Sequence, residues 1–425
     1  MRAEELAAAS TRKRGARISR RDVLSVARDL FERQGYEGTT TDDIAAAARI
    51  TKRSLYRHFG SKEQLLYELH DGFLGDLLTA VENLSGSPEE RLRSVVGAHI
   101  GNLREHGRDV KVFYEEVKHI GSARQGDLLR RQQEYERAVV EILRDGVETG
   151  DFTVADPKLA AKAILGGLTD CYRWFDTSDT GNAGAIADEL NRLILHGVEP
   201  PNQPGTPVRL TPRLASALQE RATTAGESPV DRIVTAATHL FSTRGYHSTT
   251  TQQIADRAGI TKGALYYHVK YKEEILVQIM RNLLDRYLSI LDLGRTLDLP
   301  VPQRIASYII GQTYAISLDR EAVAVLIEEQ KYLPDDMAPE IDEKERFAYS
   351  VFQQSLVEGT TSGVLDPVDL RVANLFMTGM VTFAYRWYQP GDGLDVSDLG
   401  VRFAELALHG VRTRPKRRQG SSRKR

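Results

Sequence analysis

The 425-residue sequence predicts an all-α protein that contains two tandem copies of one helical unit. Three observations predict this fold class. Apolar residues recur at helical spacing, no alternating apolar–polar run is long enough to argue for a sheet, and a long segment occurs twice. The hydrophobic fraction of 41% and the charged fraction of 27% are those of an ordinary globular protein that can bury real cores.

The internal repeat is clearest near the start of each copy. Residues 31–58 read FERQGYEGTTTDDIAAAARITKRSLYRH, and residues 241–268 read FSTRGYHSTTTQQIADRAGITKGALYYH. The two segments match at 15 of 28 positions at a constant offset of 210. Further blocks match at an offset of 213, where Glu115-Glu116 falls on Glu328-Glu329 and the Tyr-Arg-Trp run at 172–174 falls on the one at 385–387. The order of blocks is the same in both halves, so we interpret the chain as a duplication.

The duplication sets the expected domain boundaries. Five prolines between Glu199 and Pro212 exclude a regular helix there and favour a semi-rigid spacer, although Arg213 to Ala222 has helical composition. We predict, in order, a basic N-terminal arm (1–18), a small helical domain (19–65), a larger helical domain (66–198), a Pro-rich linker (199–226), a second small domain (227–275), a second larger domain (276–411) and a basic tail (412–425).

The net charge of −2 hides two strongly basic ends. Residues 11–21 carry six basic side chains and no acid, and the last fourteen residues carry eight basic side chains and no acid. Such blocks are typical of disordered tails, and they are also the electrostatic arms that hold the phosphates of nucleic acids.

Each small domain begins with an amphipathic helix. In the first copy Ser19 with Asp22 predicts a capping box, and Gly35 or its counterpart Gly245 is expected to end the helix. Apolar residues follow the helical period in both copies: Val23, Leu24, Ala27, Leu30 and Phe31, and Ile233, Val234, Ala237, Leu240 and Phe241.

Two short helices follow in each copy, at about 41–47 and 52–58 and again at 251–257 and 262–268. A tight turn joins each pair, so the pattern predicts a helix-turn-helix, whose second helix fits the major groove of DNA. Ile44, Ala45, Ile50 and Leu55, with Ile254, Ala255, Ile260 and Leu265, are expected to hold the helices together.

The polar residues of the second helix are the candidates for DNA contact. Thr51 and Thr261 begin it, where hydroxyl and free N–H groups can meet a phosphate. Arg53 and Arg57 offer guanine-edge donors in the first copy, where the second has Gly263 and Tyr267. Packing against the preceding helix is an equally good interpretation of each tyrosine. The full candidate set is Thr40, Thr51, Lys52, Arg53, Ser54, Tyr56, Arg57, His58 and Lys62, with Thr250, Thr261, Lys262, Gly263, Ala264, Tyr266, Tyr267, His268 and Lys272.

The run from Phe31 to Glu63, and again from Phe241 to Glu273, resembles the DNA-binding domain of the TetR family of repressors. The shared pattern is Phe-x-x-x-Gly-Tyr-x-x-Thr-Thr-x-x-x-Ile-Ala, then Ile-Thr-Lys-x-x-Leu-Tyr-x-His, then Lys-Glu. The resemblance implies a three-helix DNA-binding domain in each unit and a larger helical domain that binds a small ligand and dimerises. The second copy departs from it at 269–272, where Tyr271 replaces the serine expected to cap the fourth helix.

The larger domains contain few conspicuous chemical groups. We expect the Glu115-Glu116 and Glu328-Glu329 pairs to cover a solvated face, and Arg173 and Arg386 to pair with carboxylates near an interface. The alternative is that Arg173, Trp174, Arg386 and Trp387 line ligand pockets. Similar Tyr-Arg-Trp endings occur in TetR-like regulators that sense acyl-CoA thioesters, so an acyl-CoA or another lipid-like effector is a hypothesis for this chain.

The resemblance also implies that the last two helices of each unit form a four-helix interface. Here they are 157–175 and 184–195, and 369–388 and 396–408. Because both units share one chain, we expect an intrachain pseudo-dimer with two recognition helices one turn of DNA apart. The helices differ in sequence, and the first domain is the more basic, so the operator is expected to be an imperfect palindrome.

The sequence carries no motif of a hydrolase, a nucleotide-binding enzyme or a zinc protease, and no cofactor, metal or catalytic residue is expected. No run of eighteen apolar residues indicates a membrane span, Leu6 to Ala9 is too short for a signal peptide, and the single Cys171 fits a reducing cytoplasm. We therefore expect a cytoplasmic, ligand-responsive DNA-binding regulator, by family habit a repressor. The alternative is a helical ligand- or partner-binding module in which one or both helix-turn-helix motifs no longer bind DNA.

Overall fold

The structure is a computed structural model that describes residues 18–175, 182–197, 202–222, 228–391 and 393–410. The described residues are helical with no β-strand beyond an isolated bridge, so the all-α prediction is confirmed. Nearly all of the basic N-terminal arm and of the basic tail, for which we predicted phosphate contacts, lies outside the described residues.

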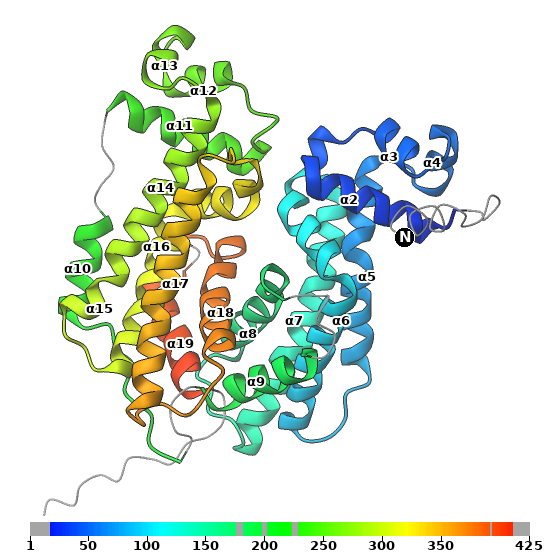
Figure 1. Cartoon of the computed structure of the whole chain (residues 1–425). Helices are drawn as coiled ribbons and strands as arrows, with labels where there is room; N and C mark the ends of the chain where they lie inside the picture. Colours follow the sequence, from blue (N-terminus) through cyan, green and yellow to red (C-terminus); the bar gives the residue numbers. More distant parts are fainter. Residues whose placement is uncertain (1–17, 176–181, 198–201, 223–227, 392, 411–425) are drawn as a thin grey trace, which may run out of the picture.

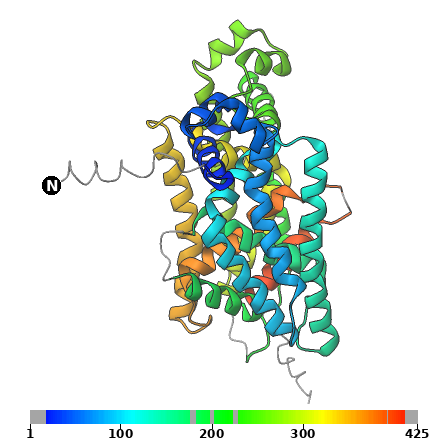
Figure 2. The ribbon, with the colours of Figure 1, turned by 90° about the vertical axis from the view of Figure 1, so that its right-hand side faces the viewer.

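The first unit has a small domain of three helices and a larger helical domain. Its elements are α2 (Arg20–Gly38), α3 (Thr41–Ala47), α4 (Lys52–His58), α5 (Lys62–Glu82), α6 (Pro88–Glu116), η1 (Val117–His119), α7 (Ser122–Thr149), α8 (Pro157–Asp170), η2 (Cys171–Arg173) and α9 (Ala183–His196). The long helices α5, α6 and α7 pack side by side along the unit (Figures 1 and 2).

The second unit repeats this order after one additional helix. Its elements are α10 (Pro212–Ala222), α11 (Pro229–Arg244), α12 (Thr251–Ala258), α13 (Lys262–His268), α14 (Lys272–Leu291), α15 (Leu293–Thr296), α16 (Val301–Glu329), η3 (Gln330–Tyr332), α17 (Ala338–Thr361), α18 (Leu370–Thr382), η4 (Phe383–Arg386) and α19 (Val396–His409).

The predicted linker at 199–226 is only partly a spacer. Helix α10 forms within it, because Thr211 accepts a hydrogen bond from the backbone of Leu214 and because Leu214 and Leu218 are spaced to bury one face. The helix packs on α14 and α16, so this part of the linker belongs to the second unit.

Local signals fix the ends of the helices in the small domains. The Ser19 hydroxyl accepts from the backbone N–H of Asp22, whose carboxylate accepts in return from the backbone of Ser19. Gly35 has φ +75°, a conformation that favours glycine, and it breaks the helical geometry of α2 at the expected place, although one further turn follows to Gly38. Gly245 ends α11 in the same way with φ +86°.

The two units pack against each other mainly through α8 and α18, with α9 and α19 beside them. Small residues permit a close crossing. A Cβ atom on Gly167 would lie 2.5 Å from the Phe376 ring, and one on Gly379 would lie 2.7 Å from the Cβ of Asp170. These helices are the ones that we expected to form the interface.

The C-terminal ends of α9 and α19 also meet closely. Gly197 has φ +68°, and a Cβ there would lie 2.3 Å from the backbone of Leu408. Gly410 has φ +65°, and a Cβ there would lie 2.4 Å from the backbone of Leu195. Each repeat therefore places a glycine against the backbone of the other repeat.

Both small domains lie at the same end of the molecule, at the top of Figure 1. Among the residues that the structure describes, no helix is both long enough and apolar enough to cross a lipid bilayer.

Candidate DNA interface and ligand cavities

The helix-turn-helix of each unit is held by the apolar residues that we expected to be structural. Ile44, Ala45 and Leu55 are buried in the first unit, as are Ile254, Ala255 and Leu265 in the second. Thr40 and Thr250 cap α3 and α12 through capping boxes with Asp43 and Gln253. Thr51 and Thr261 cap α4 and α13 by accepting from the backbone N–H of Ser54 and of Ala264.

The remaining residues of α4 lie on its open face. Thr51, Lys52, Arg53, Tyr56 and Arg57 are exposed, and Ser54 and His58 are half-buried. Helix α13 has the same pattern, in which the exposed residues are Thr261, Lys262, Gly263, Tyr266, Tyr267 and His268 and the half-buried one is Ala264. The structure thus groups the candidate residues of each second helix on one accessible surface.

Several of these side chains have partners within the domain. Lys52 pairs with Asp42 at 2.8 Å, and Arg57 donates to the Ser54 hydroxyl at 3.3 Å. The Tyr56 hydroxyl lies 3.4 Å from that of Thr41, and the corresponding distance from Tyr266 to Thr251 is 3.1 Å. Each of these tyrosines therefore contacts the preceding helix and keeps nearly half of its surface exposed.

The exposed face of α13 has different side chains from that of α4. Gln252 replaces Asp42, and Tyr267 replaces Arg57 with 87% of its surface exposed. The arginine that we expect to donate to a guanine edge in the first unit is thus absent at this position of the second, which has an aromatic ring instead.

Lys62 and Lys272 have a role that the sequence did not indicate. The Lys62 ammonium donates to the carbonyls of Tyr36 at 2.9 Å and Thr39 at 3.0 Å, and it lies 3.9 Å from the centre of the Tyr36 ring. Lys272 makes the same contacts with Tyr246 and Thr249. Burial lowers the pKa of both lysines. We predicted phosphate contacts for them, but in this structure both ammonium groups turn inward to backbone carbonyls at and just beyond the end of the first helix.

The fourth helix begins differently in the two units, as the sequence indicates. Ser61 caps α5 by accepting from the backbone N–H of Gln64 at 3.1 Å, whereas Tyr271 gives α14 no side-chain cap. The carboxylate of Glu274 instead accepts from the backbone N–H of Lys270 at 2.8 Å.

The paired glutamates do not cover a solvated face, and that expectation was wrong. Glu115, Glu116, Glu328 and Glu329 are all buried, because each pair receives a lysine of the other unit. The Lys331 ammonium lies 2.9 Å from Glu115 and 2.6 Å from Glu116, and Lys118 pairs with Glu328 at 3.0 Å and also with Glu329. We call these four glutamates and two lysines the crossed ion cluster.

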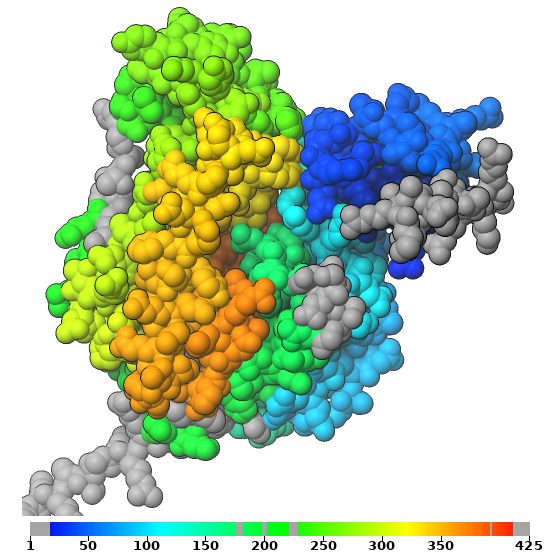
Figure 3. Space-filling model, in the orientation of Figure 1, coloured from blue at the N-terminus to red at the C-terminus, as the bar shows by residue number. Residues whose placement is uncertain are grey.

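The crossed ion cluster touches both small domains. Glu329 accepts from the backbone N–H of Tyr246 at 3.2 Å, and His119 stacks on Tyr36 with ring centres 5.0 Å apart. The Tyr332 hydroxyl fills the space beside Gly35, where a Cβ would lie 1.9 Å from it. In the space-filling view the yellow segment around η3 meets the blue segment of α2 (Figure 3). In the second unit, a Cβ on Gly245 would lie 3.6 Å from Lys118 and from His119 of the first unit, so each small domain rests partly on the opposite unit.

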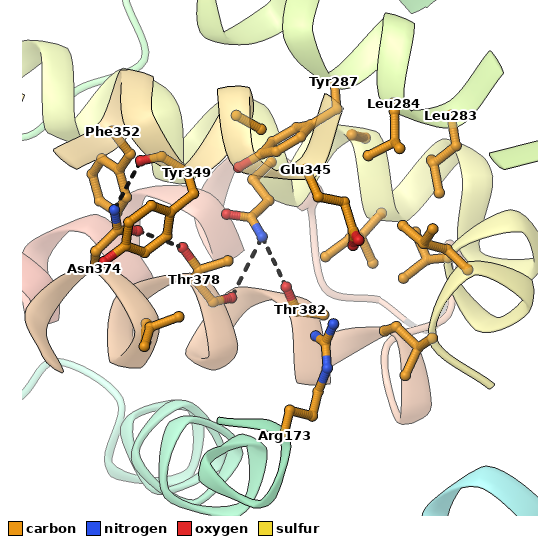
Figure 4. A pocket seen from close by; sticks show the side chains of 18 residues that line it. Arg173, Leu283, Leu284, Tyr287, Glu345, Tyr349, Phe352, Asn374, Thr378 and Thr382 are labelled. Atoms are coloured by element: carbon orange, nitrogen blue, oxygen red, sulfur yellow. Dashed lines mark hydrogen bonds between the residues drawn. The ribbon is translucent and has the colours of Figure 1, made fainter. Parts of the chain in front are cut away.

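Each larger domain contains a cavity. The first cavity has a volume of about 230 Å³ and lies between α5, α6, α7 and α8; its lining includes His70, His99, Tyr114, Tyr135 and Lys162. The second cavity has a volume of about 160 Å³ and lies between α14, α16, α17 and α18; its lining includes Leu283, Leu284, Gln312, Ile316 and Asn374 (Figure 4).

An arginine of the opposite unit closes each cavity. Arg386 and Trp387 of the second unit line the first cavity, and Arg173 of the first unit lines the second cavity, where Figure 4 shows it reaching toward Thr382. Arg386 also lies 3.4 Å from Glu328, and Arg173 lies 3.7 Å from Asp170. Trp174 does not line either of these two cavities, since it packs at the interface beneath Arg371. Each arginine thus has a carboxylate partner and also lines a cavity, and the binding of a ligand in these cavities stays a prediction.

Two family models each match the chain twice. The model described as bacterial regulatory proteins of the tetR family matches residues 23–69 and 233–279. The model described as the tetracyclin repressor-like C-terminal domain matches residues 85–198 and 298–411, which together are more than half of the chain.

Individual relatives correspond to one unit each. The HTH-type transcriptional repressor KstR2 of Mycolicibacterium smegmatis is 29% identical over 189 residues, which are 43% of this chain and 89% of the relative. KstR2 of Rhodococcus jostii is 28% identical over 43% of this chain and 92% of its own length. The solved structure of the TetR family regulator PfmR from Thermus thermophilus is 32% identical, with a TM-score of 0.38, and covers 40% of this chain and 95% of its own. The chain belongs to the TetR family of DNA-binding transcriptional regulators and carries the unit of that family twice in tandem.

Proposed function

We propose that the chain is a ligand-responsive transcriptional repressor that acts as an intrachain pseudo-dimer. One molecule would supply both recognition helices, α4 and α13, to one operator, and no second chain would be required. The observation that carries this proposal is the packing of α8 and α9 against α18 and α19, the helices through which we expected the units to pair.

The two recognition helices would read the two halves of the operator differently. Arg53 and Arg57 can each donate two hydrogen bonds to a guanine edge from α4, whereas Gly263 and Tyr267 on α13 cannot make this bidentate contact. An exposed tyrosine ring can contact the methyl group of thymine or donate its hydroxyl to a phosphate. The operator is then an imperfect palindrome in which the first unit reads the more specific half.

A small-molecule effector would act through the larger domains. Ligand in either cavity would contact residues of both units, because Arg386 and Arg173 cross the interface. A change in their positions would reach the crossed ion cluster and thereby the spacing of the two DNA-binding domains. A coupling of roughly 1–3 kcal/mol is sufficient for such control. We propose a small lipid-like effector, and an acyl-CoA thioester is one candidate; the lining of the second cavity by leucine and isoleucine side chains supports an aliphatic group.

Selection of bound duplexes from a random DNA library, followed by footprinting, tests the proposal and requires no known operator. We expect a bipartite, asymmetric footprint, an affinity that falls steeply with salt, and a single chain per duplex by light scattering. A strictly symmetric footprint, or an obligate assembly of two chains on one site, would contradict the pseudo-dimer.

The second candidate function is a helical ligand- or partner-binding module in which α13 no longer binds DNA. The loss of both arginines from α13 favours this alternative for the second unit. Arg53→Ala with Arg57→Ala, compared with Tyr267→Ala, separates the two functions. We expect each arginine to contribute about 1–3 kcal/mol to specific binding. If Tyr267→Ala leaves both affinity and footprint unchanged, this result favours a second unit without DNA contact, and an inert arginine pair would favour the same for the first unit.

A calorimetric titration against a panel of acyl-CoA thioesters tests the effector class. Binding that weakens in Arg173→Met or Arg386→Met would support the hypothesis. Absence of binding to the full chain would remove acyl-CoA from consideration and leave the DNA-binding proposal intact.

A further inference from the structure

The two cavities occupy the same place in the two repeats, so their linings can be compared position by position. An offset of 210 relates α5 to α14, and an offset of 213 relates α6, α7 and α8 to α16, α17 and α18. The surrounding helices are the same, and an arginine of the opposite unit closes both cavities. Differences in the lining are therefore differences in what each cavity can bind.

The first cavity is lined by aromatic and imidazole rings. His70 stacks on Phe113 with ring centres 3.9 Å apart, and Tyr114 approaches it edge-on at 5.4 Å. His99 lies with Nδ1 3.3 Å from the Tyr135 hydroxyl. Trp387 and Phe383 reach this cavity from the second unit.

Both histidines of the first cavity keep an unpartnered nitrogen. The side-chain amide nitrogen of Gln132 lies 3.4 Å from Nε2 of His70 and can only donate, so Nδ1 carries the proton of His70. That N–H and Nε2 of His99 have no hydrogen-bond partner among the described residues, although each histidine is only 1% exposed. Burial lowers the pKa of both histidines to about 3, so they are neutral near pH 7. A buried polar nitrogen without a partner costs stability unless a ligand or water supplies one.

The charged groups around the first cavity are already paired. Lys162 lies 2.9 Å from Glu136, and Arg386 lies 3.4 Å from Glu328. The lining therefore presents two neutral imidazole nitrogens between aromatic rings, together with Nε of the ion-paired Arg386, which also has no hydrogen-bond partner among the described residues.

The second cavity lacks the two histidines and the two tyrosines of the first at the matching positions. Met280 stands where the first repeat has His70, Gln312 replaces His99, Ile327 replaces Tyr114, Ala348 replaces Tyr135, and Leu375 replaces Lys162. The amide of Gln312 is satisfied, because it donates to the Thr382 hydroxyl at 2.9 Å, as the dashed line in Figure 4 shows. The rings of Tyr287, Tyr349 and Phe352 also line this cavity, but aliphatic side chains outnumber them; these include Leu283, Leu284, Ile316, Val323 and Leu326.

We infer that the two cavities bind two different effectors: the first an uncharged aromatic compound with a hydroxyl group, which His70 and His99 recognise, and the second an aliphatic compound. This inference rests on the proposed ligand-responsive function and gives each repeat its own ligand class. The aromatic ring would stack among Tyr114, Phe383 and Trp387, and its hydroxyl would supply the missing partner of a histidine nitrogen. Two different effectors would then control the same DNA-binding activity, each through its own cavity.

Calorimetry with 2-naphthol and 1-decanol tests the inference on the full chain. The probes have the same number of carbon atoms and one hydroxyl group each, and both are uncharged at neutral pH, so they contrast an aromatic hydroxyl compound with an aliphatic one of similar size. We expect each probe to bind with a stoichiometry of one per chain, and we expect the two to bind simultaneously.

Exchange of residues between the repeats supplies matched variants. His70→Met with His99→Gln places the residues of the second cavity in the first, and it should weaken 2-naphthol about tenfold or more and leave 1-decanol unchanged. Ala348→Tyr inserts the ring of Tyr135 into the second cavity, and it should abolish binding of 1-decanol alone. If the double variant does not fold, His99→Gln by itself should still weaken 2-naphthol several-fold.

Three results would overturn the inference: a stoichiometry of two for either probe, an affinity for 2-naphthol that His99→Gln does not change, or no binding of either probe. Anisotropy measurements with labelled operator DNA on the same protein distinguish this failure from failure of the proposed function. If the chain binds DNA but the two probes do not occupy separate cavities, only the two-effector inference is contradicted. If the probes occupy separate cavities but the chain binds no DNA, only the proposed regulator function is contradicted.

Discussion

The Lys118 ammonium lies 3.0 Å from the Glu328 carboxylate although 210 residues separate the two in sequence. The mirrored contact, from Lys331 to Glu115, is 2.9 Å long. Burial alone would lower the pKa of Lys118, but the neighbouring Glu328 and Glu329 carboxylates raise it. The crossed ion cluster thus joins the two repeats at a buried point directly below their DNA-binding domains.

Removal of one lysine from the crossed ion cluster should destabilise the chain strongly. In Lys118→Met, Glu329 would remain buried without its cation and Glu328 would keep only Arg386, and loss of one partner of a buried pair costs about 3–5 kcal/mol. The midpoint of denaturant unfolding measures this loss. Lys52→Met is the matched control, because Lys52 and Asp42 form an exposed pair worth about 0–1 kcal/mol. Equal effects of the two substitutions would show that the cluster contributes no more than a surface pair.

Alanine at Gly197 should destabilise the contact between the ends of α9 and α19. The residue has φ +68°, and its new Cβ would lie 2.3 Å from the backbone of Leu408, so the two helix ends would have to separate. We expect a loss of about 1–3 kcal/mol in the free energy of unfolding. Gly184→Ala is the control, since no atom lies within 4 Å of a Cβ there and Gly184 lies in a helix. That substitution should be neutral or stabilise by up to about 1 kcal/mol.

Acidification should destabilise the chain through His70 and His99. Their pKa is lowered by burial to about 3, so between that pH and about 6.5 the unfolded state binds more protons than the folded state. Stability therefore falls as the pH falls below 6.5, by about 1.4 kcal/mol for each histidine at pH 5.5. Unfolding midpoints of the parent and of His70→Met with His99→Gln, compared at pH 7.5 and 5.5, measure this contribution. A parent whose loss on acidification matches that of the variant would contradict it.

Lys62→Met should weaken DNA binding by the first unit, because it makes the DNA-binding domain less rigid. The ammonium joins two carbonyls at the end of the first helix to the start of α5, and each hydrogen bond to a charged group is worth about 1.5–3 kcal/mol. We expect increased hydrogen exchange in α2 and α3, with the dependence of DNA affinity on salt retained. If Lys62 instead contacts a phosphate, exchange should not change and the logarithmic salt slope should fall by about 0.9.

The sequence predicted the elements whose signals are local. Ser19, Thr40 and Thr250 cap the helices that they were expected to cap, because the residues that complete each capping box lie three positions away. The second helix of each helix-turn-helix was also placed at its observed bounds, since its apolar positions and its turn lie within one short segment.

Side-chain partners that are distant in sequence were not predictable in the same way. Lys62 donates to carbonyls 23 and 26 positions earlier in the chain. Every residue has a backbone carbonyl, so the amino-acid types do not indicate which carbonyl a lysine will contact. The burial of Glu115 and Glu116 depends on a lysine of the other repeat, so composition alone favoured a solvated face. The Glu-Glu pairs recur at an offset of 213, and so do Lys118 and Lys331. This shared offset was the one signal in the sequence that could have indicated a crossed arrangement.

The crossing of α8 and α18 distinguishes the two halves from one another. Gly167 leaves room for the Phe376 ring, whereas their mirrored positions hold Met380 and Ala163. A self-pair of the second half would bring methionine against phenylalanine and crowd the crossing, and a self-pair of the first half would bring glycine against alanine and leave it hollow. Because a substitution in a fused chain occurs on one side only, bulk lost by one half can be recovered by the other, and this crossing fits two unlike halves better than two copies of either half.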